Sequence, residues 1–454
     1  MSKVILQIDG NNFYASCEQM IDPSIKGKGL VVLSNNDGCI IARSSEARRM
    51  GIPMGQPYFK LKNNLTQLNI NVRSSNYELY GDISNRLMQL LRKNCEELEI
   101  YSIDEAFGTI KRPKGKCLYQ WGKNLRALVY QNIGIPISIG IGETKVLSKI
   151  SNHLAKKIQN NAGIFDIGII QNKDHYLNQI KVDKVWGIGK RMSIWLKNKG
   201  ITNARELRDM SSDQIKGKYG VVGLRIQNEL KGNLCIPIKE TSSDRKEICV
   251  SRSFSYPIDS LEDLNQAIIK YVLIASAKLR KNNQLSSAIT VFTNTNTHSK
   301  DFFRSEATER ISVPSSNSKI MIEKSLLLTK EIFKPYKKFI KAGVILHKLQ
   351  SNQYKQNLIF DAQNIQEIYL QRLDNVIDNI NSKNGIDTIN WGSSMMEKEW
   401  SPRRKKLSRI KTTNLANIPT IYFGCIRKQI YHYPLFIEPN YNTNESCIKV
   451  NKNK

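Results

Sequence analysis

Three carboxylates stand where they can bind a divalent cation. Asp9 ends the apolar run Val4–Asp9, and Asp104 and Glu105 form an acidic pair between two further apolar runs. Adjacent like charges repel unless a cation compensates them, and Mg²⁺ prefers oxygen ligands while it keeps several waters. Such cations neutralise the charge that spreads over a phosphate during nucleotidyl transfer. The three residues therefore predict a metal-dependent phosphoryl-transfer site, although an ordinary solvated turn also carries acidic pairs.

The elements around these carboxylates follow the order β-α-β-β-α-β when residues 20–80 are treated as an insertion. The apolar periodicity predicts these strands and helices, which are Val4–Asp9, Phe13–Met20, Glu99–Ser102, Ala106–Ile110, Trp121–Gln131 and Ile135–Ile141. This order is the split-βαβ, ferredoxin-like arrangement. In that topology the first strand lies beside a hairpin whose tight turn carries residues 103–105, so we expect Asp9 to approach Asp104 and Glu105.

The insertion carries its own local signals. Two apolar runs, Leu30–Leu33 and Cys39–Ala42, are joined by Ser-Asn-Asn-Asp-Gly, which favours a hairpin. Ser44–Met50 predicts a short helix that Gly51 stops. A longer amphipathic helix is expected at Glu78–Leu91, where apolar residues recur near helical spacing.

The residue composition and periodicity of the rest of the chain change at three points. From Lys181 the pattern is helical, and a polar linker at Lys239–Glu247 separates this part from a second, smaller α/β segment. The elements expected in that segment are Ile248–Ser255, Leu261–Leu279, Ala288–Thr293, Ile320–Phe333 and Ala342–Leu346. After Lys348 the chain is rich in Asn, Gln and Lys with sparse apolar residues, which indicates a tail that is loosely structured in part.

The bulk composition narrows the class of partner. The chain has 454 residues, more than one core accommodates, so several domains are expected. Its 69 Lys and Arg against 40 Asp and Glu give a net charge of +29, which suits nucleic acid, although an anionic membrane surface or a merely basic soluble protein also fits. No apolar run approaches the roughly 20 residues of a membrane span, and no signal-peptide pattern opens the chain.

The cysteines and histidines argue against a zinc site or a disulfide framework. The eight cysteines are scattered without a CxxC pair, and only five histidines are present. That usage favours a reducing compartment. We therefore expect a soluble cytoplasmic protein.

Four motifs in a consistent order resemble one family. They are Asp9–Glu18, Ser34–Arg43, Ser75–Tyr80 and Tyr101–Phe107, which begins Tyr-Ser-Ile-Asp-Glu. The pattern resembles the Y-family translesion DNA polymerases, specifically the UmuC branch, the catalytic subunit of an SOS mutagenesis polymerase. The resemblance runs from residue 4 to about residue 360. It implies an error-prone, template-directed DNA polymerase that lacks a proofreading domain.

The resemblance also implies a multidomain α/β architecture. The expected parts are a ferredoxin-like palm at residues 1–168 with small fingers inserted at about 20–78, a helical thumb with a helix-hairpin-helix at 169–238, a linker at 239–247, an α/β little finger at 248–348, and a partly structured C-terminal tail at 349–454. Two other functions are weighed against this one. A nucleotide cyclase shares the palm topology and paired carboxylates but usually lacks a thumb hairpin and a basic second domain. A non-catalytic DNA- and clamp-binding scaffold would have a decayed core, whereas the carboxylates are all present.

By resemblance, Asp9, Asp104 and Glu105 ligate two Mg²⁺ ions, with the carbonyl of Gly10 as an extra ligand. One ion activates the primer 3′-hydroxyl, and the other neutralises the triphosphate of the incoming dNTP. The expected substrates are therefore dNTPs and primed, damaged DNA. An error-prone polymerase of this kind acts in DNA repair.

Five residues are expected to contact the nucleotide. Phe13 and Tyr14 match the family's gate motif, in which a rigid ring excludes a ribose 2′-hydroxyl by clash; a core aromatic is the other reading of Tyr14. Arg48 matches a fingers residue whose guanidinium fork grips the triphosphate. Lys156 resembles the lysine that reaches the β and γ phosphates, or is an ordinary solvated helix lysine. Ser45 stands where many relatives outside this branch carry Tyr, which leaves the nucleotide contacts there open.

The expected DNA contacts lie in two segments. Gly187 and Gly189 fit a helix-hairpin-helix whose backbone N–H groups bind a DNA phosphate, and Lys190 and Arg191 follow directly. A plain turn also carries such glycines. Arg252 lies at the start of the expected little finger and adds positive charge there.

The tail suggests partners. Gln356, Leu358, Ile359 and Phe360 resemble a sliding-clamp peptide, in which the apolar residues insert into a cleft; docking on its own domain and a chance match are the alternatives. The run that begins at Trp400 is similar to the C-terminal segment of UmuC relatives. The family implies a UmuD-like dimer and a RecA-like filament as partners, although no surface for either is visible in the residues.

Overall fold

The computed structural model describes residues 2–112, 117–158, 163–240, 244–352, 364–385, 388–392, 400–401 and 403–408. All of them belong to the first of two compact units, which spans Met1–Thr413. Within the described residues, no helix is both long enough and apolar enough to cross a membrane.

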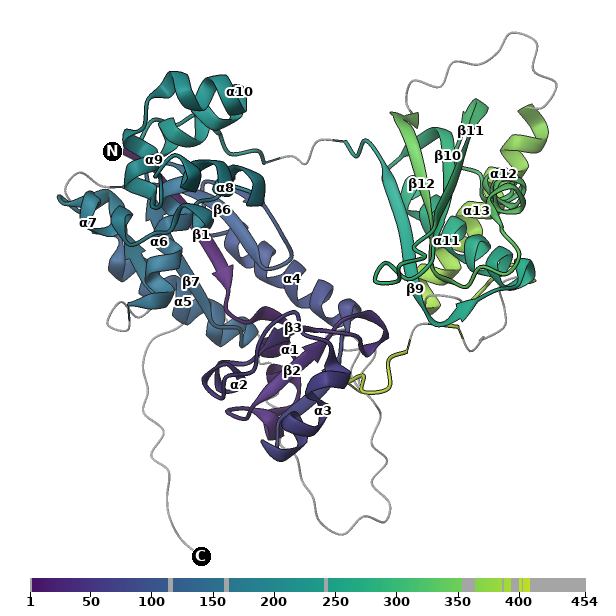
Figure 1. Cartoon of the computed structure of the whole chain (residues 1–454), viewed down its shortest axis with the longest axis horizontal. Helices are drawn as coiled ribbons and strands as arrows, with labels where there is room; N and C mark the ends of the chain where they lie inside the picture. Colours follow the sequence, from purple (N-terminus) through teal and green to yellow (C-terminus); the bar gives the residue numbers. More distant parts are fainter. Residues whose placement is uncertain are drawn as a thin grey trace, which may run out of the picture. The chain divides into compact units, whose positions relative to one another are not determined.

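The first sheet has five strands in the order β5-β6-β1-β7-β8 (Figure 1). Its strands are β1 Ser2–Gly10, β5 Glu97–Ile100, β6 Glu105–Arg112, β7 Ile137–Gly142 and β8 Ile164–Asp166. The first four have the ferredoxin-like order, and β8 adds a strand parallel to β7. The expected fold is therefore confirmed. One detail was wrong: Glu105 was placed in the tight turn, whereas it is the first residue of β6.

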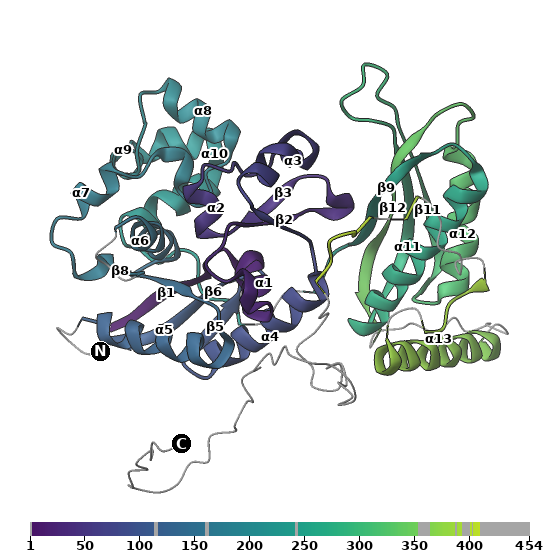
Figure 2. The same cartoon turned by 90° about the horizontal axis from the view of Figure 1, so that it is seen from below.

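Helices cover both faces of this sheet (Figure 2). They are α1 Phe13–Ile21, α4 Tyr77–Arg92, α5 Tyr119–Ile133 and α6 Lys145–Lys157. The apolar residues of α1, α4 and α5 form one core with alternate residues of β1, which are Val4, Leu6 and Ile8. Helix α6 packs against β1, β7 and β8. The packing requires glycine at position 140, because a Cβ there would lie 2.2 Å from the backbone nitrogen of Asn152 in α6.

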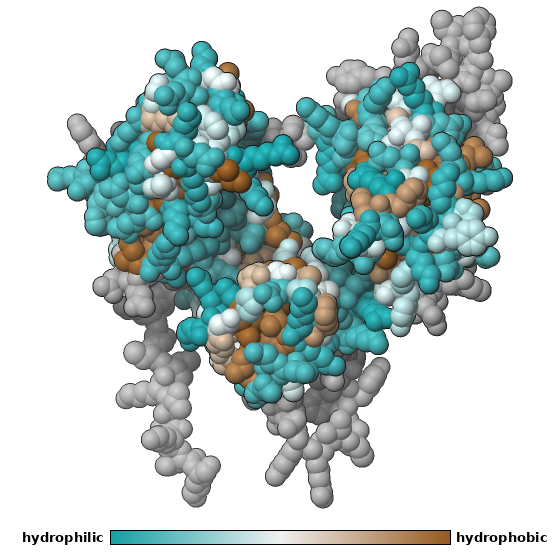
Figure 3. Space-filling model, in the orientation of Figure 1, coloured by the Kyte–Doolittle hydropathy of each residue, from teal (hydrophilic) through white to brown (hydrophobic). Residues whose placement is uncertain are grey.

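The insertion between α1 and α4 is a small folded unit. Its sheet has the order β3-β2-β4, with β2 Leu30–Leu33, β3 Ile40–Arg43 and β4 Asn71–Ser74, beside the helices α2 Ser45–Arg49 and α3 Tyr58–Gln67. The predicted hairpin of β2 and β3 is confirmed, whereas β4 and α3 were not anticipated. Apolar side chains gather on the surface of this unit in Figure 3, and the exposed ones there are Met50, Met54, Phe59 and Leu68.

A helical segment follows the first sheet, as the sequence predicted. Its helices are α7 Lys173–Asn178, α8 Lys190–Asn198, α9 Ala204–Asp209 and α10 Ser212–Leu230. They share a core with the outer face of α6, in which Leu147, Leu196 and Leu207 are buried. Thus α6 connects the sheet to the helical segment.

A second α/β segment has its own antiparallel sheet in the order β11-β10-β12-β9. Its elements are β9 Ile248–Ile258, α11 Leu261–Lys281, β10 Gln284–Asn294, β11 Arg304–Ser315, α12 Ser318–Ile332 and β12 Phe339–Ser351. The sequence missed β11, an edge strand in which polar residues alternate with few apolar ones. Helix α13 Asn364–Asn384 follows and is joined to α11 by Arg280, which bonds Asp378 at 2.6 Å.

Candidate active site

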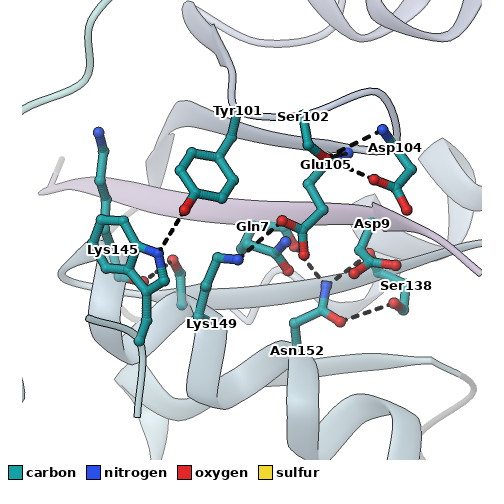
Figure 4. A network of polar contacts seen from close by, with 12 residues as sticks. Gln7, Asp9, Tyr101, Ser102, Asp104, Glu105, Ser138, Lys145, Lys149 and Asn152 are labelled. Carbon is teal, nitrogen blue, oxygen red and sulfur yellow. Dashed lines mark hydrogen bonds and ion pairs between the residues drawn. The ribbon is translucent and has the colours of Figure 1, made fainter. Parts of the chain in front are cut away.

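The register of two strands brings the three carboxylates together. Asp9 is the direct partner of Glu105 in the β1–β6 pair, and the N–H of Gly10 donates to the carbonyl of Asp104 at 2.8 Å. The side chains lie at the same end of the strand pair (Figure 4). Ser102 fixes the turn, because its hydroxyl donates to Asp104 Oδ1 at 2.7 Å and accepts the N–H of Glu105 at 3.1 Å.

Two lysines of α6 face these carboxylates. Lys156 Nζ lies 2.6 Å from Asp9 Oδ1, and Lys149 Nζ lies 3.0 Å from Glu105 Oε2. The two lysines are seven residues apart, two helical turns, so they share one face of α6. Burial raises the pKa of Asp9 to about 6, although Lys156 lowers it, and the nearby Glu105 raises it further. The three carboxylates outnumber the two lysines that face them.

This donor set fits a hard cation in its chemistry. Two aspartates and a glutamate supply oxygen ligands, with the backbone of Gly10 beside them. In the described part of the chain, the side chains of Asp, Glu, His and Cys form no group of three or more whose present geometry could hold a metal ion. Asp9 and Glu105 are each paired with an ammonium group of α6. A cation would therefore bind by replacing those ion pairs.

The expected gate residues lie on α1 beside the site. Phe13 is buried in the core, and Gly10 has no room for a side chain, since a Cβ there would approach the Phe13 ring to 3.0 Å. Tyr14 is half-buried and stacks on Tyr80 of α4, with ring centroids 4.5 Å apart and planes within 16°. The sequence reading assigned no role to Tyr80, although it ends the Ser75–Tyr80 motif.

The other nucleotide candidates occupy different places. Ser45 and Arg48 are both exposed on α2 of the insertion, which Ser44 caps at its N-terminus. Lys156 lies at the carboxylates, as its contact with Asp9 shows. Lys149 was missed, and the signal for it was its spacing of two helical turns from Lys156.

The expected DNA hairpin begins helix α8. Gly187 has φ +91°, and a Cβ there would meet the side chain of Ile226. Gly189 is the N-cap, no side chain caps the helix, and its first turn carries Lys190 and Arg191, both exposed, with no acidic residue. Open N–H groups with two cations beside them form an anion-binding arrangement.

Arg252 lies in β9 and donates to the Ser251 carbonyl at 2.8 Å. The clamp-peptide residues Gln356, Leu358, Ile359 and Phe360 lie outside the described residues, so that prediction stays open. Trp400 is described: it is buried and packs edge-on against Phe254 of β9, with centroids 5.8 Å apart.

The sheet order and the carboxylate end of β1 and β6 are those of a polymerase palm, and comparison with solved structures places the fold among the Y-family DNA polymerases. A Y-family DNA polymerase chimera of Dbh and Dpo4 matches with a TM-score of 0.62 at 20% identity, over 77% of this chain and 100% of that one. Dbh DNA polymerase in an insertion ternary complex matches with a TM-score of 0.52 over the same shares.

The sequence relatives are closer. Protein UmuC of Salmonella typhimurium strain LT2 is 35% identical over 414 residues, which are 90% of this chain and 98% of that protein. MucB of Escherichia coli is 32% identical over 91% and 98% of the two chains. DNA polymerase IV 1 of Bacillus subtilis is 27% identical over 293 residues, 63% of this chain and 69% of that protein.

Family models match in the same order along the chain. The impB/mucB/samB family model matches residues 8–153, its C-terminal domain matches residues 245–358, and a domain of unknown function matches residues 371–421. The chain belongs to the impB/mucB/samB family, the UmuC branch of the Y-family polymerases. It is a translesion DNA polymerase, and neither the cyclase nor the non-catalytic scaffold is favoured.

Proposed function

We propose that Asp9, Asp104 and Glu105 bind two Mg²⁺ ions and that the chain joins a dNTP to the 3′-hydroxyl of a primer on damaged DNA. The observation that supports this most is the strand register, which pairs Asp9 with Glu105 and bonds Gly10 to Asp104. When bound, the cations activate the hydroxyl and neutralise the triphosphate. The excess of acid over lysine at the site provides the charge that would attract them.

The two lysines take different parts. Lys156 is paired with Asp9, which has a raised pKa, and Lys149 with Glu105. With cations on the carboxylates, Lys156 would be free to turn toward the phosphates that enter beside it. Lys156 then binds the β and γ phosphates as a point charge. Lys149 stays against Tyr101, over whose ring it lies at 4.7 Å, and positions Glu105.

The remaining contacts follow the family pattern. Tyr14 excludes the ribose 2′-hydroxyl, and Phe13 supports it from the core. Arg48 grips the triphosphate from the insertion, with Ser45 beside it. In this assignment the first sheet is the palm, the insertion the fingers, the α7–α10 segment the thumb and the β9–β12 segment the little finger.

The sites that would bind the DNA backbone are also proposals. The N-terminus of α8, with Lys190 and Arg191, binds a DNA phosphate without reading sequence, and Arg252 adds a second contact. DNA affinity should then fall steeply with salt, and its logarithmic slope should become about 1 shallower for each lysine or arginine that is removed from a phosphate. A slope that stays flat would show that the +29 charge does not serve DNA binding. Binding of a sliding clamp, a UmuD-like dimer and a RecA-like filament rests on resemblance alone.

Primer extension on a primed template with Mg²⁺ tests the metal assignment. Asp104→Ala should lower the rate at least about 1000-fold, or about 4 kcal/mol, because a proposed ligand is lost for the cation that neutralises the transition-state charge. The matched control is Asp301→Ala, which removes an exposed aspartate from the turn between β10 and β11 and should leave the rate unchanged. Equal rates for Asp104→Ala and wild type, or template-independent formation of cyclic nucleotides, would contradict the proposal.

A further inference from the structure

A buried tyrosine stands directly behind the proposed sugar gate. Tyr80 of α4 is fully buried, and its ring is nearly parallel to that of Tyr14 at a centroid distance of 4.5 Å. Tyr77, one turn earlier on the same helix, meets both rings edge-on at 6.0 and 6.1 Å. The gate ring is therefore supported on one face by a second ring, which has no access to solvent or substrate.

The supporting ring is itself held in place by a buried acid. The hydroxyl of Tyr80 donates to Glu18 Oε1 at 2.7 Å, and Glu18 is fully buried on α1, one turn beyond Tyr14. The Ser408 hydroxyl reaches the same oxygen at 3.3 Å, a longer contact. Tyr80 is thus the principal donor to this acid, and the bond ties α4 to the helix that carries the gate.

This bond fixes the far end of the Tyr80 ring, because the hydroxyl oxygen lies on the axis of the Cβ–Cγ bond. The plane of the ring is set by its packing against Tyr14 and Tyr77, and the two constraints together hold the stack within 16°. Burying a carboxylate destabilises the fold unless it is hydrogen-bonded, and burial raises the pKa of Glu18. The Tyr80 hydroxyl is the shorter of the two hydrogen bonds that compensate this buried acid, so the acid in turn constrains the position of Tyr80.

A sugar gate works only if its ring keeps its place. A 2′-hydroxyl adds one oxygen to the sugar, so a small displacement of the Tyr14 ring would admit it. We propose that Tyr80, anchored by Glu18, is a positioning residue that sets the polymerase's discrimination between deoxyribonucleotides and ribonucleotides through Tyr14. This inference rests on the proposed gate function of Tyr14.

The test measures single-turnover incorporation of dCTP and CTP opposite a template guanine. Tyr80→Leu should lower the preference for dCTP by about 2- to 10-fold, the equivalent of one aromatic stack, with dCTP incorporation itself little changed. Tyr80→Phe keeps the ring but loses the anchor, so the preference should fall by about 2-fold. Glu18→Gln should keep the wild-type preference, because the amide oxygen accepts the same bond.

A double substitution separates a positioning role from a merely structural one. Tyr14→Ala should relax sugar discrimination the most, and Tyr14→Ala/Tyr80→Leu should equal it, because Tyr80 acts only through Tyr14. The control is Tyr271→Leu, which removes a buried tyrosine from the core of the second α/β segment and should leave the preference unchanged.

Five outcomes decide the matter. A drop in preference for the two Tyr80 variants that vanishes in the Tyr14→Ala background supports the inference. Equal loss of dCTP and CTP incorporation, or additive effects in the double variant, overturns it while leaving the gate intact. Should Tyr80→Leu not fold, an unchanged preference in Tyr80→Phe overturns the inference. Unchanged sugar discrimination in Tyr14→Ala itself overturns the gate and the inference together.

Discussion

The β1–β6 strand pair carries a cluster of charged side chains at each end, and the two clusters are built differently. At one end Asp9 pairs with Glu105, and at the other Ser2 pairs with Arg112. The Arg112 end is closed: one guanidinium nitrogen bonds both oxygens of Asp166 at 2.6 Å, and the N–H of Gly168 donates to the same carboxylate at 3.0 Å. One cation there meets one anion.

The Asp9 end is open and carries an excess of acid. Three carboxylates share two lysines, and the Lys156 side chain is 39% exposed, against 10% for Arg112. Burial raises the pKa of both Asp9 and Asp166, and a second carboxylate raises each further, Glu105 at Asp9 and Glu143 at Asp166. Each also has a cation that lowers its pKa, but Glu143 has a lysine of its own, Lys173, at 2.6 Å. The surplus of acidic over basic side chains, rather than burial or ion pairing alone, distinguishes the proposed metal-binding end from the Arg112 end.

The largest expected difference between the two ends is in catalysis. Asp9→Asn keeps the size of the side chain but removes a proposed metal ligand, so primer extension should fall at least about 1000-fold. The free energy of unfolding should change by less than about 1 kcal/mol, because the lost ion pair with Lys156 is offset by relief of repulsion from Glu105. A variant that unfolds while its residual folded fraction extends primers normally would assign Asp9 a structural role.

The closed end should show the reverse pattern. Arg112→Met leaves Asp166 buried without its cation, which should lower the free energy of unfolding by about 3–5 kcal/mol, measured by urea denaturation. Extension per folded molecule should stay at the wild-type rate. The expected loss follows from burial, since the side chains of Arg112 and Asp166 are 10% and 4% exposed.

A double variant checks that the loss comes from the stranded charge. Arg112→Met/Asp166→Leu replaces both partners by apolar side chains and should recover most of the stability that Arg112→Met loses. If the double variant is as unstable as the single one, packing of the Arg112 stem matters more than the ion pair. In either case the two ends are distinguished by the primer-extension rate of the folded protein, which should fall for substitutions at the Asp9 end and not for those at the Arg112 end.

The open end was predictable from sequence, and the closed end was not. Asp9, Asp104 and Glu105 are marked locally, because each stands at the end of an apolar run whose alternation reveals a strand. Arg112 and Asp166 are 54 residues apart, and Glu18 and Tyr80 are 62 apart. Nothing in the neighbourhood of either residue identifies its partner, since such pairs are fixed only when the strands and helices have packed.

The same distinction explains the errors in the elements. The β2–β3 hairpin was predicted because its turn residues are diagnostic, whereas β11 was missed because an edge strand with a polar alternation lacks an apolar signal. Glu105 was assigned to the turn because it lies between the two predicted strands, Glu99–Ser102 and Ala106–Ile110. Pairing with β1 extends β6 to include it, and that long-range contact is what brings its carboxylate to Asp9.

The smallest expected effect distinguishes the ends by their response to a cation. Lys149→Met removes one of the two lysines from the open end, so in the absence of Mg²⁺ the three acids repel one another more and stability should fall by about 1 kcal/mol. Mg²⁺ at ten times its dissociation constant stabilises a protein that binds it by about 1.4 kcal/mol, and it should stabilise this variant more than wild type, since no lysine competes for Glu105. The deficit of Arg112→Met should not shrink with Mg²⁺. Thermal unfolding with and without Mg²⁺ measures the stability deficits of both variants. If the deficit of Lys149→Met is the same under the two conditions, the Asp9 end responds to the cation no more than the Arg112 end does.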